Sequence, residues 1–155
     1  MHPFAGQTMA WGMDPQARPA PHGLAPDAAW MEAHARRVIA TLPAEFRAHL
    51  GDVVLLVEEI ADDETLSAMG IEHPLDLTGL YHGLPVGEKA NASGQMPDRI
   101  HLYRRPILEE WIETDVRLDD LVAHVVIHEI GHHFGLSDDD MHALEDAAGE
   151  NGAPD

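Results

Sequence analysis

The sequence contains no cysteine and few basic residues. Without cysteine the chain can form no disulfide, thiolate metal site or cysteine nucleophile, so any bound metal must be held by nitrogen and oxygen donors. Only 9 Lys and Arg stand against 28 Asp and Glu, which gives a formal net charge of −19 at pH 7. Because affinity for nucleic acids depends largely on cations that neutralise phosphates, this composition argues against a nucleic acid as partner.

Long apolar runs are also missing from the sequence. No segment approaches the roughly 20 apolar residues that a helix needs to span a bilayer. Residues Met1 to Trp11 have neither the basic start nor the continuous apolar stretch of a signal peptide. We therefore expect no membrane partner and a cytoplasmic location, and we find no pattern that specifies an oligomeric state.

The composition that is present fits one globular domain. The chain has 155 residues, 45% of them hydrophobic and 24% charged, which suits a single packed core. Residues 1–26 hold five of the eleven prolines and no hydrophobic periodicity, which predicts a flexible N-terminal tail. We assign 27–150 to the domain and 151–155 to a disordered C-terminus.

The domain alternates helical patterns with short β-branched or alternating runs. Asp27 is a good N-cap for the first helix, Pro43 opens the second, and Pro106 opens a later one. We predict helices at 28–42, 43–50, 63–69, 106–112 and 119–134, and a final helix after Ser137. We predict strands at 53–57, 75–86 and 99–104, and a loop at 91–94.

The helix predicted to end near Phe134 carries the chemistry. Apolar residues surround most of its circumference, so we expect it to be buried, with Asp119 or Asp120 as its cap. It contains H-E-x-x-H at residues 128–132, and the i to i+4 spacing places both imidazoles on one face, able to hold one metal ion. In this arrangement the histidines bind a zinc ion (Zn²⁺), and Glu129 takes a proton from the water that the metal activates.

Gly135 and Asp138 extend this pattern to H-E-x-x-H-x-x-G-x-x-D. In a chain so rich in histidine, H-E-x-x-H alone arises by chance with a probability of roughly 7%, and the extended pattern with roughly 1 in 1,000. A glycine at a helix end can adopt the left-handed conformation that reverses the chain, which brings the next segment back toward the histidines. We therefore predict that zinc is bound by His128, His132 and Asp138.

Asp138 also has a purely structural interpretation. Ser137 and three aspartates precede the final helix, where serine is a ready cap and acidic side chains favour the N-terminal dipole. Both roles can hold at once. If Asp138 is only part of the cap, Glu145 is the first substitute, since some zinc hydrolases use a glutamate from a downstream helix. The remaining substitutes are Asp139, Asp140 and His142.

Two further histidines lie on the same predicted helix. His124 is one turn before His128 and extends the stripe of imidazoles, while His133 points about a quarter turn from His132. Neither fits the spacing that Gly135 completes. We therefore interpret both as supporting or partly exposed histidines rather than ligands.

Three blocks of the sequence resemble the small bacterial zincin-like metallopeptidases, which share H-E-x-x-H-x-x-G-x-x-D in a minimal domain. The blocks are G-L-Y-H-G-L-P at 79–85, P-D-R-I-H-L-Y-R-R-P at 97–106 and H-E-I-G-H-H-F-G-L at 128–136. The resemblance extends over most of residues 30–148. It implies a compact α+β domain, in which a small mixed β-sheet packs on helices that include a buried active-site helix.

The same resemblance implies zinc at the positions matching His128, His132 and Asp138, and Glu129 as the catalytic base. Only seventeen residues follow Asp138. Because the larger metzincins need a methionine turn well beyond the third ligand, we expect a reduced zincin here.

These patterns favour a zinc-dependent metallopeptidase that hydrolyses bonds in a peptide or protein substrate. An edge strand beside the site could align an extended peptide. A nearby side chain could stabilise the oxyanion, although packing or solvation explains each candidate at least as well. The candidates are Tyr81, His82, Tyr103 and Arg104.

Two other functions compete with peptide hydrolysis. In the first, the domain is a non-catalytic zinc-binding module that recruits a partner. The presence of Glu129 argues against it, since a closed structural site gains nothing from that carboxylate. In the second, the protein is a metal-dependent nuclease, which ranks last because the chain is strongly acidic.

Overall fold

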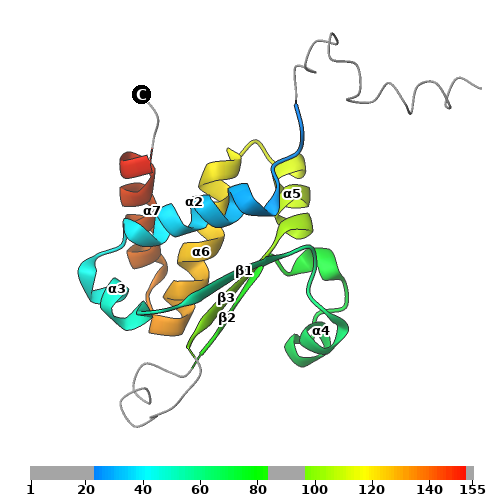
Figure 1. Ribbon diagram of the computed structural model, residues 1–155, viewed down its shortest axis with the longest axis horizontal. Helices are drawn as coiled ribbons and strands as arrows, with labels where there is room; N and C mark the ends of the chain where they lie inside the picture. Colours follow the sequence, from blue (N-terminus) through cyan, green and yellow to red (C-terminus); the bar gives the residue numbers. More distant parts are fainter. Residues whose placement is uncertain (1–22, 84–96, 153–155) are drawn as a thin grey trace, which may run out of the picture.

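The computed structural model describes residues 23–83 and 97–152, which form an α+β domain (Figure 1). The elements are α2 (Ala28–Ala40), α3 (Ala44–Leu50), β1 (Val54–Glu58), α4 (Asp63–Met69), the 3-10 helix η1 (Pro74–Asp76), β2 (Gly79–His82), β3 (Arg99–Tyr103), α5 (Arg104–Glu113), α6 (Leu118–Phe134) and α7 (Asp138–Gly152). Most of the predicted tail and the predicted loop at 91–94 lie outside the described residues. No described helix is long and apolar enough to cross a bilayer.

A three-stranded mixed sheet with the strand order β1-β3-β2 lies at the centre of the fold. β1 is parallel to β3, and β2 is antiparallel to β3 with Gly79 opposite Leu102. Successive side chains of a strand point to opposite faces, so Ile100 and Leu102 of β3 enter the main core while Tyr103 enters a smaller cluster. Because β2 is last in the strand order, it forms one edge of the sheet, and it packs beside α6.

The main core lies between the sheet and the helices α2, α6 and α7. α6 contributes most to it, because Val122, Val126, Ile127 and Ile130 are fully buried. Figure 1 shows α2 crossing α6 with α7 beside it, while α4 lies on the other side of the strands. The apolar circumference that the sequence predicts for α6 thus reflects burial between a sheet and two helices.

A smaller cluster covers the far face of the sheet. Leu66 of α4 packs there with Leu80 of β2 and Tyr103 of β3, together with Ala61 and Leu77. The H-E-x-x-H motif lies on α6, so the candidate site is on the opposite side of the sheet.

Most of the predicted elements are present. α4 has the predicted bounds, and β1 and β3 agree with the prediction to within one residue. The first helix is capped as predicted, with the Asp27 carboxylate accepting a hydrogen bond from the Trp30 backbone N–H. These features depend on local periodicity and capping, which the sequence shows directly.

The predicted strand at 75–86 is wrong in its first part. Pro74 instead opens η1, where the His73 side chain accepts a hydrogen bond from the Leu75 backbone N–H at 3.2 Å. A proline at this position fixes φ in the helical range and therefore favours a turn over a strand. Only residues 79–82 of the described part form the strand, and residues 84–86 lie outside it.

The predicted cap of α6 is also wrong. The helix begins at Leu118, its N-cap is Arg117 without a side-chain hydrogen bond, and Asp119 and Asp120 lie in the first turn. Arg117 donates two hydrogen bonds to the Asp119 carboxylate, and this hydrogen bonding is the main reason why the pKa of Asp119 is lowered. The two aspartates still favour the helix dipole, although they do not cap the helix.

Residues near both predicted limits of the domain take part in the fold. The Pro26 carbonyl oxygen accepts a hydrogen bond from Arg104 Nε at 2.8 Å, although Pro26 belongs to the predicted tail. At the other end α7 continues to Gly152, two residues beyond the predicted limit of the domain. α5 likewise begins at Arg104, two residues before Pro106.

Candidate metal centre

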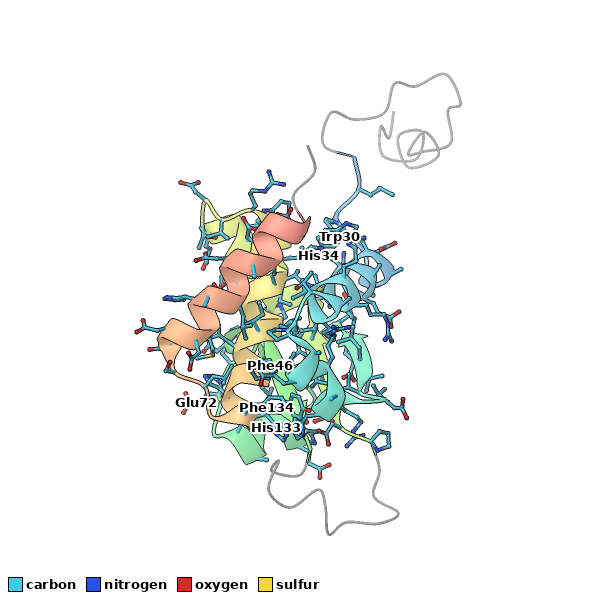
Figure 2. The ribbon with its side chains drawn as sticks, turned by 90° about the vertical axis from the view of Figure 1, so that its left-hand side faces the viewer. Trp30, His34, Phe46, Glu72, His133 and Phe134 are labelled. Atoms are coloured by element: carbon cyan, nitrogen blue, oxygen red, sulfur yellow. The ribbon has the colours of Figure 1, made fainter. Side chains whose placement is uncertain are left out.

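The C-terminal end of α6 reverses the chain as predicted. Gly135 adopts the left-handed conformation with φ 71°, and its N–H and that of Leu136 bond to carbonyls in the last turn of the helix. This arrangement satisfies carbonyls that the helix end would otherwise leave without partners. As a result α7 folds back and runs alongside α6 (Figure 2).

Gly131 allows α7 to approach α6 closely. A Cβ at Gly131 would overlap the sulfur of Met141. Met141 is buried on α7, and Glu145 follows it by one helical turn on the same face. The glycine within H-E-x-x-H therefore brings a carboxylate of α7 to the histidines of α6.

His124, His128 and Glu145 meet at this contact. Oε1 of Glu145 lies 2.9 Å from Nδ1 of His124 and 3.0 Å from Nε2 of His128. Their ligand atoms all lie within 4.8 Å of one another, and no other group of three potential ligands within the described ranges meets this condition. The structure thus brings together His128 and the predicted substitute Glu145, and adds His124, which the sequence suggested only as a supporting residue.

The environment of His128 suits a metal ligand. Its Nε2 atom is buried and lies next to the Glu145 carboxylate. Burial, followed by the neighbouring His124, lowers the pKa of the His128 imidazole, while Glu145 raises it. A neutral imidazole is the form that binds a metal ion, so this shift favours ligation.

His132 and Asp138 do not belong to this group of ligand atoms, and both are exposed. His132 is exposed on α6, and its ring centroid lies 6.0 Å from that of His128. Asp138 is the exposed first residue of α7. Ser137 caps this helix as predicted, because its hydroxyl accepts a hydrogen bond from the Asp140 backbone N–H at 3.1 Å. The ligand role of Asp138 stays a prediction.

Glu129 lies under the edge strand β2. Its half-buried carboxylate accepts a hydrogen bond from the Tyr81 backbone N–H. Burial raises the pKa of Glu129, whereas His132 and this hydrogen bond act in the opposite direction. Gly79 permits the close approach, because a Cβ there would lie 2.8 Å from Val125 and 3.4 Å from Glu129.

The Tyr81 side chain contacts Asp98 and His133. The phenol donates a hydrogen bond of 2.6 Å to Asp98, and burial followed by this bond raises the pKa of Tyr81. The ring stacks on His133 at a centroid distance of 4.0 Å. Figure 2 shows His133 beside Phe134 at the end of α6, and its ring contacts Phe134 as well as Tyr81.

The other candidates for oxyanion stabilisation have partners of their own. Arg104 bonds to the Pro26 carbonyl at 2.8 Å and to the Glu59 carboxylate at 2.9 Å. Tyr103 belongs to the cluster on the far face of the sheet, where burial raises its pKa to about 12. The ring of His82 lies 5.5 Å from that of His101. Arg104 and Tyr103 thus have structural contacts and His82 is exposed, and a role in oxyanion stabilisation stays a prediction for each.

A long buried helix with H-E-x-x-H under the antiparallel edge strand of a small mixed sheet defines a zincin-type domain. The family model of the zincin-like metallopeptidases matches residues 50–148, from the end of α3 to near the end of α7. The chain therefore belongs to the zincin-like metallopeptidase family. No match is found among the curated proteins. The family implies a zinc ion, and the buried Nε2 of His128 beside nitrogen and carboxylate donors fits one.

Proposed function

We propose that the protein is a zinc-dependent metallopeptidase in which Glu129 is the general base and His128, His132 and Asp138 bind the metal. The observation that carries this proposal is the half-buried Glu129 carboxylate beneath β2, next to two histidines on the same helix. Membership of a metallopeptidase family supports the same reaction.

The chemistry divides between the metal and the residues of the chain. Bound zinc supplies Lewis acidity, which polarises a carbonyl group and acidifies water. Glu129 removes the proton of the attacking water and passes it to the leaving amine. Burial raises the pKa of Glu129 and so makes it a stronger base. The Tyr81 N–H holds the carboxylate in place during both transfers.

The edge strand β2 is the proposed substrate-binding element. β3 occupies one side of β2, and Glu129 lies against its other side at Tyr81. An extended peptide that pairs with the rest of this side would run past the Glu129 carboxylate. Since the protein carries a net charge of −19, we expect neutral or basic peptides to be preferred over acidic ones.

Substitution of the proposed base tests this function. We expect Glu129→Gln to bind zinc as the wild type does and to lower kcat/KM on a mixed peptide library by at least about 100-fold, the usual effect of losing a general base. The matched control is Glu110→Gln, which changes an exposed glutamate of α5. Zinc content is measured by metal analysis and cleavage by mass spectrometry.

Two outcomes would contradict the proposal. If wild type and Glu129→Gln bind zinc and cleave equally, Glu129 is not the base. If the zinc-loaded wild type cleaves no peptide, the non-catalytic zinc-binding module becomes the better interpretation.

A further inference from the structure

The imidazoles of His124 and His128 converge on one carboxylate oxygen in a way that simple ion pairing does not explain. Their ring centroids lie 3.9 Å apart, so two protonated rings would repel each other. Nε2 of His128 is buried and lies 3.0 Å from Glu145 Oε1, the same oxygen that lies 2.9 Å from Nδ1 of His124. A cation bound by all three groups would hold them together without requiring either ring to be protonated.

We propose that His124, His128 and Glu145 form a second metal position beside the catalytic one. Two imidazoles and one carboxylate are a donor set that Zn²⁺ and neighbouring divalent metals accept. The donors stand on two helices that are held together by the Gly131–Met141 contact. They are therefore largely positioned before a metal arrives, which lowers the cost of ordering them.

The two positions exclude each other because both use His128. A neutral imidazole has one acceptor nitrogen, so the ring binds one ion at a time. Zinc at the second position leaves His132 and Asp138 without metal and leaves Glu129 without an activated water. The second position is thus a resting site, in which the protein holds zinc but does not hydrolyse peptides. The exclusion rests on the proposed function, whereas the existence of the second position does not.

The experiment removes one ligand of the proposed catalytic position, His132, and measures whether the protein still binds a metal ion. We expect His132→Ala to bind one Zn²⁺ or Co²⁺ with an affinity within about tenfold of the wild type, although it loses peptidase activity. Adding Glu145→Gln to this variant should weaken binding by more than about 100-fold, beyond the loss that an outer group causes. Metal content is measured by equilibrium dialysis, and Co²⁺ ligation by visible absorption.

Control variants keep the test independent of folding and of turnover. His132 is exposed, so its loss should leave the circular dichroism spectrum and the Tm nearly unchanged. In the His132→Ala background, His124→Ala should change the Co²⁺ spectrum, whereas His142→Ala, an exposed histidine of α7, should not.

Three results would overturn the inference. It fails if His132→Ala alone loses the metal, or if Glu145→Gln makes no difference in that background. Two ions bound to the wild type would disprove the exclusion. These three results concern metal binding and do not depend on peptide cleavage. The proposed peptidase activity is tested separately with Glu129→Gln, so the two proposals can fail independently.

Discussion

At the scale of single residues, the tyrosine next to the candidate site illustrates how one hydrogen bond limits a side chain's role. Tyr81 contributes two groups in different directions. Its backbone N–H holds Glu129, while its hydroxyl is bound to the buried Asp98. Because that hydroxyl already has an acceptor and its pKa is raised, the phenol is a structural group, and the backbone of the same residue is the part that serves the site.

Tyr81→Phe separates these two contributions. We expect the free energy of unfolding to fall by about 1.5–3 kcal/mol, because a hydrogen bond to a charged acceptor is lost and Asp98 stays buried. The value of kcat/KM per folded molecule should be nearly unchanged, because the backbone N–H remains. Urea denaturation and initial rates measure the two effects, with Tyr103→Phe as the matched control. A large loss of kcat/KM at unchanged stability would instead make the phenol a catalytic group.

At the scale of elements, the contact between α6 and α7 decides which carboxylate reaches the imidazoles. Gly135 reverses the chain, and Gly131 sets the distance between the two helices. Both positions need glycine for different reasons. Gly135 needs a backbone conformation that side chains disfavour, whereas Gly131 needs the space that Met141 occupies.

Alanine at two helical glycines tests this packing. We expect Gly131→Ala to destabilise the fold by about 1–3 kcal/mol, because the added methyl overlaps Met141 in a closely packed core. It should also weaken metal binding, since α7 must shift. Gly149→Ala on α7 meets no atom within 4 Å and should stabilise the fold by up to about 1 kcal/mol through helix propensity. Thermal or urea denaturation measures both. Equal effects at the two positions would show that α7 does not pack as described.

At the scale of the whole molecule, the charge balance is the dominant property. A formal net charge of −19 on 155 residues means that the folded chain repels itself. Salt screens such repulsion, because the Debye length falls from about 30 Å at 0.01 M to about 10 Å at 0.1 M. The expanded unfolded chain suffers less from the same charges, so screening favours the folded state.

The Tm should therefore rise when NaCl is increased from 0.01 M to 0.2 M. Choline chloride should have the same effect at equal ionic strength, because screening does not depend on the identity of the cation. Differential scanning calorimetry in a metal-free buffer measures both series. A constant or falling Tm would indicate that the attractive ion pairs, such as Arg104 with Glu59, outweigh the overall repulsion.

The sequence by itself determined the features that arise within one segment. The periodicity of apolar residues predicts the buried helix α6, the i to i+4 spacing places His128 and His132 on one face, and Gly135 predicts the reversal after it. Each depends on a few neighbouring residues, so local physics is sufficient. The same locality explains the error at residues 75–78, where Pro74 and its turn outweighed an alternating pattern.

The tertiary structure alone decided which residues from different segments meet. Glu145 reaches His124 and His128 across 17 or more residues of chain because of the closeness of α6 and α7, which Gly131 permits. Glu129 reaches the Tyr81 backbone because β2 forms the edge of the sheet beside α6. Such contacts depend on packing distances between whole elements. No spacing within the sequence encodes these distances directly, so the second set of donors became visible only in the folded chain.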